Sequence, residues 1–272
     1  MPELRTAVGA VLDWPVGHAA AAVAGPSGVL ATAGDTEREF KLASVTKPLA
    51  AYAVLVAVEE GAVEWDMPAG PEGSTVRHLA AHTSGLSFSE GVQQAKPGTK
   101  RIYSNVGFEV LGETVAEAAG MPFHRYLHEA VLAPLGMTAT RLDGSPAAGA
   151  VSTADDLAKF ATELLSPTLV HRKTLDEATT VAFPGLDGIL PGYGRQKPND
   201  WGLGFEIRDG KSPHWTGANS SPRTFGHFGQ SGTFLWVDAD AQAACVVLTD
   251  RDFSRWSVEA WPRYTDGVLA AL

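Results

Sequence analysis

The stretch from Leu42 to Val58 constrains this chain more than any other. Ser44 and Lys47 are three residues apart, so a helix would place them on one face. Proline is tolerated in a helix only in the first turn, so Pro48 places the helix start near Ser44. The run from Leu49 to Val58 has no polar stripe, which predicts a helix buried on every side. A hydroxyl and an amine therefore stand at the mouth of a buried helix, where free N–H groups favour an anion.

Composition narrows the function classes. The chain has 272 residues, enough for one large domain or two interlocked ones, and a net charge of −10 with no cluster of Lys or Arg. Neither nucleic acid nor a membrane is an expected partner. Cys245 is the single cysteine, so an internal disulfide is impossible, and its apolar neighbours predict an inert thiol. No secretory signal and no membrane-spanning run is visible, so a cytoplasmic protein is expected.

Periodicity and turn residues predict strands at both ends and helices between them. The expected helices are a long one from near Ser44, then 75–81, 105–119, 122–131, 153–165 and 254–272, the last interrupted at Pro262. The expected strands are 18–24, 28–33, 201–208, 233–238 and 243–249. Residues 180–200 are rich in Gly and Pro and are expected to form a loop that is a candidate lid.

This order predicts an α+β fold. One antiparallel sheet would be built from both termini and flanked by helices, with a helical domain inserted between. The expected division is a discontinuous sheet domain over 1–60 and 201–272 and a mainly helical domain over 61–200. The active site is expected at their junction.

Three short motifs could meet at that junction. They are Ser44-Val45-Thr46-Lys47, Tyr103-Ser104-Asn105 at a helix start, and His227-Phe228-Gly229 followed by Gln230 at a strand edge. Each has a purely structural interpretation: Ser44 and Asn105 as helix caps, Tyr103 as a core aromatic, His227 as a sheet histidine. The S-x-x-K spacing alone is a weak signal, but all three motifs in order favour catalysis.

Other motifs do not point to a site. His124 and His128 lie one helical turn apart, but no third ligand accompanies them, so no metal is expected. The segment from Gly204 to Ser212 has one residue too many for a P-loop. No G-x-S-x-G occurs, which disfavours an α/β-hydrolase. No cofactor is expected.

The three motifs together resemble the serine β-lactamase-like superfamily: class C β-lactamases, D-alanyl-D-alanine peptidases and related esterases. Four further segments support the resemblance. They are H-T-S-G-L at 82–86, P-G at 97–98, P-L-G-M-T at 134–138 and W-G-L-G at 201–204. The resemblance extends over roughly residues 40 to 250. It implies the β-lactamase/transpeptidase-like form of the α+β fold.

The resemblance also implies roles for the site residues. Ser44 would be the acylated nucleophile, with Lys47 and Tyr103 handling the proton. The backbone N–H groups of Ser44 and Gln230 would form the oxyanion hole, and Gly229 would let the backbone approach the substrate. Which of Lys47 and Tyr103 is the base stays open, and a cationic Lys47 would lower the pKa of Tyr103.

The remaining substrate contacts are expected from two polar side chains. Asn105 would hold a substrate carbonyl or orient Lys47. His227 stands where many relatives have lysine, which weakens the case for binding a substrate carboxylate. The segments around Tyr193 and Trp215 are expected to wall the pocket, and their aromatic residues suggest an apolar acyl or leaving group.

These expectations combine into a metal-free serine hydrolase. It would cleave a small-molecule ester or amide, including β-lactams or D-amino-acid peptides as candidates, through an acyl-Ser44 intermediate. The alternative is a sensor or binding module of the same fold that acylates without turnover. The sequence leaves the natural substrate and the oligomeric state open.

Overall fold

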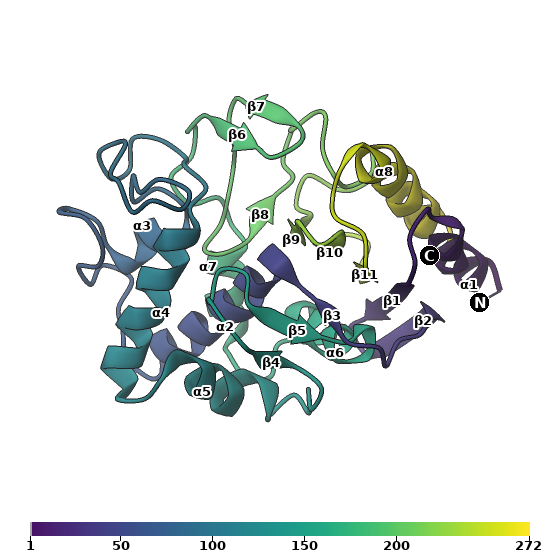
Figure 1. Cartoon of the computed structure of the whole chain (residues 1–272), viewed down its shortest axis with the longest axis horizontal. Coiled ribbons are helices and arrows are strands. Elements are labelled where there is room, and N and C mark those ends of the chain that lie inside the picture. The colour runs from purple at the N-terminus through teal and green to yellow at the C-terminus, as the bar shows by residue number, and fades with distance from the viewer. Residues whose placement is uncertain (1) are drawn as a thin grey trace.

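A six-stranded antiparallel sheet forms the centre of the molecule, and both ends of the chain contribute to it. The computed structural model describes residues 2–272. The strand order is β2-β1-β11-β10-β9-β8 (Figure 1). The sheet that the sequence predicts from both termini is therefore confirmed. Its strands are β1 (Ala19–Gly25), β2 (Gly28–Gly34), β8 (Glu206–Ile207), β9 (Phe225–Gly229), β10 (Thr233–Asp238) and β11 (Ala243–Thr249).

Helices cover both faces of this sheet. Successive side chains of a strand point to opposite faces, and β11 shows the alternation clearly. Cys245 and Val247 pack in one cluster with α1 (Pro2–Gly9) and α8 (Arg255–Ala270). Val246 and Leu248 pack in the other cluster with α2 (Thr46–Glu59) and α6 (Ala154–Leu165). All seven residues of β11 are buried, as a strand covered on both faces must be.

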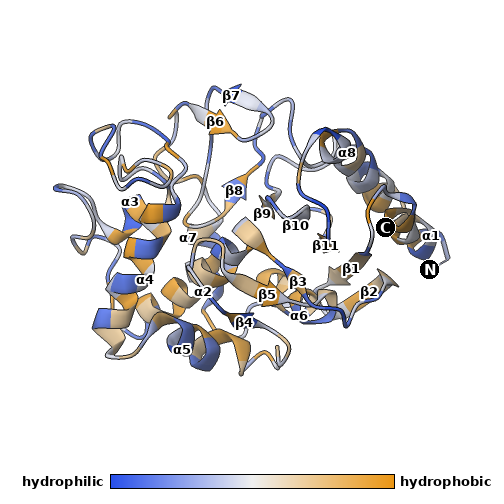
Figure 2. Ribbon diagram, in the orientation of Figure 1, coloured by the Kyte–Doolittle hydropathy of each residue, from blue (hydrophilic) through white to orange (hydrophobic). Residues whose placement is uncertain are grey.

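The buried helix that the sequence predicts is α2. Twelve of its fourteen residues are buried, so it is the centre around which other helices pack. The helices that surround α2 lie at the end of the molecule opposite the two termini (Figure 1). Figure 2 shows α4 with both hydrophobic and hydrophilic residues along its length, as expected of a helix with one apolar face. Helices α4 (Asn105–Ala119), α5 (Phe123–Leu127) and α7 (Arg172–Ala178) pack on α2, and α3 (Val76–Ala80) packs on α4.

Two small sheets complete the fold. In the first, β5 (Ala150–Ser152) lies between β3 (Phe40–Lys41) and β4 (Arg141–Leu142). The chain passes directly from β3 into the turn that carries Ser44. The second is a hairpin of β6 (Gly188–Leu190) and β7 (Gly194–Gln196). The predicted loop over 180–200 thus contains a short hairpin. α6 belongs by sequence to the segment expected to be helical, yet it packs on β1 and β11 of the central sheet.

Several predicted elements were wrong in detail. The segment 201–208 is a strand only at Glu206–Ile207, because Gly204 has φ +93° and breaks the extended backbone. α8 continues through Pro262 although proline removes one helical hydrogen bond there, and Trp261 and Tyr264 on either side of it are buried in the core. Helices α1 and α7 were not predicted, since both are too short for a clear periodicity. Across residues 2–272, none of the helices combines the length and the apolar character that crossing a membrane requires.

Candidate active site

The nucleophile candidate stands on a tight turn immediately before α2. Ala43–Val45 form a 3₁₀ turn and α2 begins at Thr46, two residues after Ser44, close to the start that the sequence predicts. Ala43 has φ +46°, a left-handed conformation that a residue with a Cβ rarely adopts. Such strain persists only where the surrounding structure enforces it, and it is concentrated at functional sites. Ser44 itself is partly exposed, while Val45 and all of the first α2 turn are buried.

Lys47 is completely buried, and its amine is held by three oxygen atoms. Its Nζ lies 2.7 Å from Asn105 Oδ1, 2.8 Å from the Ala147 carbonyl oxygen and 3.3 Å from Ser44 Oγ. The prediction that Asn105 orients Lys47 agrees with this contact. Asn105 is not the cap of α4, however: the Ser104 hydroxyl accepts the Gly107 N–H at 2.9 Å and fills that role.

Tyr103 reaches the other side of the same hydroxyl. Its OH donates to Ser44 Oγ at 2.7 Å, and its ring lies 4.6 Å from Lys47 Nζ. His82 supports this placement, because its Nδ1 accepts the Ser104 N–H at 3.1 Å and its ring packs 4.6 Å from that of Tyr103. The hydroxyl, the amine and the phenol therefore converge from segments up to 59 residues apart, as the sequence predicts.

Burial decides the charge of these groups. It lowers the pKa of Lys47 well below its ordinary value, and the distant Glu109 carboxylate only partly opposes this effect. It raises the pKa of Tyr103, which the hydrogen bond with Ser44 lowers only partly. The net lowering of the Tyr103 pKa that a cationic Lys47 would cause is not observed, because desolvation of the phenolate dominates. The phenol is neutral, and the amine is the group brought closer to losing its proton.

The end of β9 lies directly against the nucleophile turn. A Cβ on Gly229 would stand 2.3 Å from the Leu42 carbonyl oxygen, so only glycine allows this approach. Ser231 Oγ donates to the Lys41 carbonyl at 2.7 Å, and Thr233 Oγ1 donates to the Leu42 carbonyl at 2.9 Å. These contacts join the β9–β10 turn, which contains Gln230, to the backbone that carries Ser44.

His227 lies in the same strand, beyond the two positions where β8 pairs with β9. Its ring is buried and packs against Tyr103 and Trp201, with ring centroids 5.7 and 5.3 Å away. Its Nδ1 lies 2.6 Å from the Phe228 carbonyl oxygen. Burial and the nearby Lys47 lower the pKa of His227 to about 3, so this histidine is uncharged at neutral pH.

A small cavity of ≈ 110 Å³ opens beside Ser44. The 180–200 segment contributes Leu190 and Pro191 to its wall. Aromatic rings and several polar side chains form the rest of the wall. The lining residues are Ser44, Phe88, Tyr103, Leu190, Pro191, Trp201, Glu206, His227, Phe228 and Gln230.

A larger open cleft adjoins the cavity. It has a volume of ≈ 920 Å³ and shares Phe88, Tyr103 and Pro191 with the cavity wall. Phe88 is 52 % exposed and Ile189 is 68 % exposed, so this cleft presents apolar side chains to solvent. Lys100 and Arg195 also line it. A substrate could therefore extend from Ser44 into two compartments of very different size.

The segment around Tyr193 contributes to the cavity wall through Leu190 and Pro191, as predicted, but the side chains of Tyr193 and Trp215 do not line the cavity. They pack behind Phe228, with ring centroids 6.3 and 5.8 Å from its ring. The sequence shows which segments carry aromatic residues, but it does not show which of these side chains contact the cavity and which pack behind them. Phe88 and Trp201 line the cavity instead.

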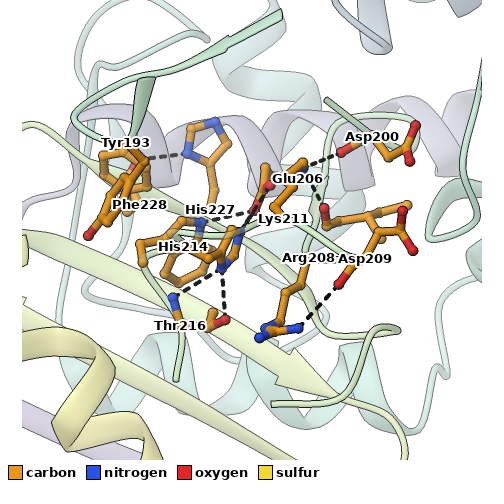
Figure 3. A network of polar contacts seen from close by, with 12 residues as sticks. Tyr193, Asp200, Glu206, Arg208, Asp209, Lys211, His214, Thr216, His227 and Phe228 are labelled. Atoms are coloured by element: carbon orange, nitrogen blue, oxygen red, sulfur yellow. Dashed lines mark hydrogen bonds and ion pairs between the residues drawn. The ribbon is translucent and has the colours of Figure 1, made fainter. Parts of the chain in front are cut away.

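Glu206 is a functional candidate that sequence reasoning missed. Its carboxylate forms a buried ion pair with Lys211, accepts from Trp215 Nε1 at 2.9 Å and contacts His214 Nε2 at 2.9 Å (Figure 3). Burial alone would raise the pKa of Glu206, but His214 and Lys211 outweigh it and lower that pKa. An ionised carboxylate thus stands in the cavity wall. A lone glutamate in a short strand carries no motif that would reveal this.

The convergence of a serine, a lysine and a tyrosine beside a strand edge defines a class of serine hydrolases, and the comparisons with known proteins agree. The Beta-lactamase family model matches residues 16–270, so the chain belongs to the Beta-lactamase family. A crystal structure described as a beta-lactamase from Mycobacterium bovis is 62 % identical. It has a TM-score of 0.96 and covers 97 % of this chain and 98 % of that one.

More distant similarities were also found. A putative D-alanyl-D-alanine carboxypeptidase of Salmonella is 26 % identical over 212 residues, which are 58 % of this chain and 47 % of the relative. The chain thus spans less than half of that protein's length. Simvastatin synthase from Aspergillus terreus is 18 % identical with a TM-score of 0.78, covers 98 % of this chain and 94 % of its own, and shows the fold alone.

Proposed function

We propose that this protein hydrolyses a small ester or amide through an acyl intermediate on Ser44. The observation that carries the proposal is the pair of contacts on one hydroxyl: Tyr103 OH at 2.7 Å and Lys47 Nζ at 3.3 Å from Ser44 Oγ. A serine hydroxyl is a weak nucleophile until a neighbouring base takes its proton. Both neighbours needed for proton transfer are within or near hydrogen-bonding distance.

The burial of Lys47, which lowers its pKa, favours the neutral amine as the base, and the hydrogen bonds of the amine are compatible with that state. A neutral amine has two N–H donors, which the Asn105 and Ala147 oxygens accept at 2.7 and 2.8 Å. Its lone pair then remains for the Ser44 O–H. An ordinary lysine at pH 7 would cost about 4.6 kcal/mol to deprotonate. The lowered pKa of Lys47 reduces that cost.

The proposed reaction then proceeds in two halves. Lys47 takes the Ser44 proton as Oγ bonds to the carbonyl carbon, and the N–H groups of Ser44 and Gln230 receive the developing oxyanion. The neutral Tyr103 gives its proton to the leaving group as that bond breaks, and Lys47 returns a proton to Tyr103. Water repeats the sequence on the acyl-enzyme and frees Ser44.

The test combines covalent labelling with turnover. A fluorophosphonate probe should label Ser44, and chromogenic acetate esters should be hydrolysed in more than one turnover per molecule. Ser44→Ala should lose both signals, whereas Ser89→Ala, on an exposed residue near the cleft, should keep them. A D-alanyl amide and a chromogenic cephalosporin identify the preferred leaving group. Labelling without turnover would support a non-catalytic sensor instead, and no labelling would refute both.

A further inference from the structure

The chemical preference of the small cavity can be derived from the tautomer of His227. A carbonyl oxygen only accepts hydrogen bonds, so the Nδ1 that lies 2.6 Å from the Phe228 oxygen must carry the proton. The ring is neutral, with its pKa lowered to about 3 by burial and by Lys47. Its second nitrogen, Nε2, is therefore an unprotonated acceptor.

This acceptor has no partner in the protein. Nε2 is buried and forms no hydrogen bond with any of the residues 2–272, although the side chain lines the cavity beside Ser44. Figure 3 shows the contact of His227 with Phe228 and no dashed line at the other ring nitrogen. A buried acceptor left unpaired is unfavourable, so a ligand that supplies a donor to it is bound more tightly than one that does not.

The charges around the cavity exclude an anionic ligand group. Within the described chain, the lining contains no Lys or Arg, and its single charged residue is Glu206. The oxygens of Glu206 are already paired with Lys211, His214 and Trp215, so this carboxylate does not compete for a ligand donor, and no cation in the lining would balance the charge of an anionic ligand group. The volume of ≈ 110 Å³ is below the roughly 150 Å³ of a cavity that holds benzene, so it admits a group of only a few heavy atoms.

We propose that the substrate portion that enters this cavity is a short group bearing a hydroxyl or amine donor, which binds Nε2 of His227, and that a carboxylate is rejected there. The inference rests on the proposed hydrolase function and specifies its substrate class. The bulkier portion of the substrate lies in the open cleft on the other side of Tyr103.

Two matched pairs of esters test the proposal by placing the donor on either side of the bond to be cleaved. The first pair is the 2-hydroxypropanoyl and 2-methylpropanoyl esters of one phenol, with the 2-aminopropanoyl ester as the amine arm. The second pair is the acetate esters of ethylene glycol and of propanol. In at least one pair, kcat/KM for the donor-bearing ester should exceed that of its isostere by about 5- to 100-fold.

Variants of His227 connect the preference to its acceptor. His227→Phe should abolish the preference, so that the two esters of each pair react at equal rates, and Ser44 labelling measures separately how far the nucleophile itself is affected. His227→Lys should reverse it, so that the half-ester of malonate gains relative to the 2-methylpropanoyl ester. His128→Phe, on an exposed histidine, is the matched control and should change neither ratio. The circular dichroism of each variant checks its folding.

The outcomes separate this inference from the proposed function. Hydrolysis of simple acetate esters with equal rates within both pairs would overturn the inference and leave the hydrolase assignment intact. A preference that survives in His227→Phe would also overturn it. No hydrolysis of any ester and no labelling of Ser44 would remove both.

Discussion

Replacing Asn105 with aspartate tests whether neutral Lys47 is the base. The substitution keeps the side-chain shape but places a carboxylate where Asn105 Oδ1 now lies 2.7 Å from Lys47 Nζ. At that distance and an effective dielectric constant of about 20, the attraction between two unit charges is about 6 kcal/mol. Desolvation of the new carboxylate removes much of this, and a neighbouring carboxylate raises the pKa of an amine by roughly 1–3 pH units.

The sign of the effect on activity follows from the raised pKa. A neutral base acts above its pKa, so raising the Lys47 pKa moves the acid limb of the pH profile to higher pH. In Asn105→Asp the limb should move up by about 1–3 pH units. Below the limb, kcat/KM should fall about tenfold for each pH unit by which the limb moves. At alkaline pH the activity should recover.

The assay is the pH dependence of Ser44 labelling by a fluorophosphonate, followed by kcat/KM on an acetate ester. Asn219→Asp adds the same charge at an exposed position and should leave the limb in place. An Asn105→Asp enzyme that folds normally but shows an unchanged acid limb, or one moved to lower pH, would contradict the argument that Lys47 acts as the neutral base.

Three further predictions follow from the geometry. Tyr103→Phe removes the proton donor 2.7 Å from Ser44 Oγ, so kcat/KM should fall by about 10²- to 10⁴-fold with little change in the melting temperature. Equal activity in the variant would exclude the proton-transfer role. Gly229→Ala puts a Cβ 2.3 Å from the Leu42 oxygen, so the backbone beside Ser44 must move; ester turnover should drop sharply, and an unaffected rate would refute the close approach. Glu206→Gln leaves the buried Lys211 without its counter-ion and should lower the free energy of unfolding by about 3–5 kcal/mol in a urea titration. Because the folded-state pKa of Glu206 is lowered, its stabilisation is complete above the ordinary glutamate pKa and lost as pH falls; a variant whose acid sensitivity equals that of the parent would argue against the ion pair.

Local patterns were sufficient for the elements with strong periodicity. The apolar run after Lys47 predicted α2, and the alternating segments at both ends predicted the central sheet, because burial on one or both faces imposes a period on the sequence. The same reasoning missed α7. It predicted too long a strand around Gly204 and an interruption of the last helix at Pro262, and at both positions the packed chain adopts another conformation.

The sequence by itself determined the fold and the residues that converge at the candidate site. Ser44, Lys47, Tyr103 and Asn105 belong to motifs whose chemistry is readable from residue type and spacing, and the structure brings their side chains together. Only the tertiary structure decided the protonation of these groups. Burial, which no spacing reveals, lowers the pKa of Lys47 and raises that of Tyr103.

The same distinction holds for the cavity wall. Glu206, Phe88 and Trp201 reach the cavity from three separate segments, while Tyr193 and Trp215 remain one layer behind. Whether a side chain lines the cavity or packs behind its wall depends on how a strand edge, a loop and a helix end meet in space. That meeting is a property of the packed chain and leaves no periodic signal in any one segment.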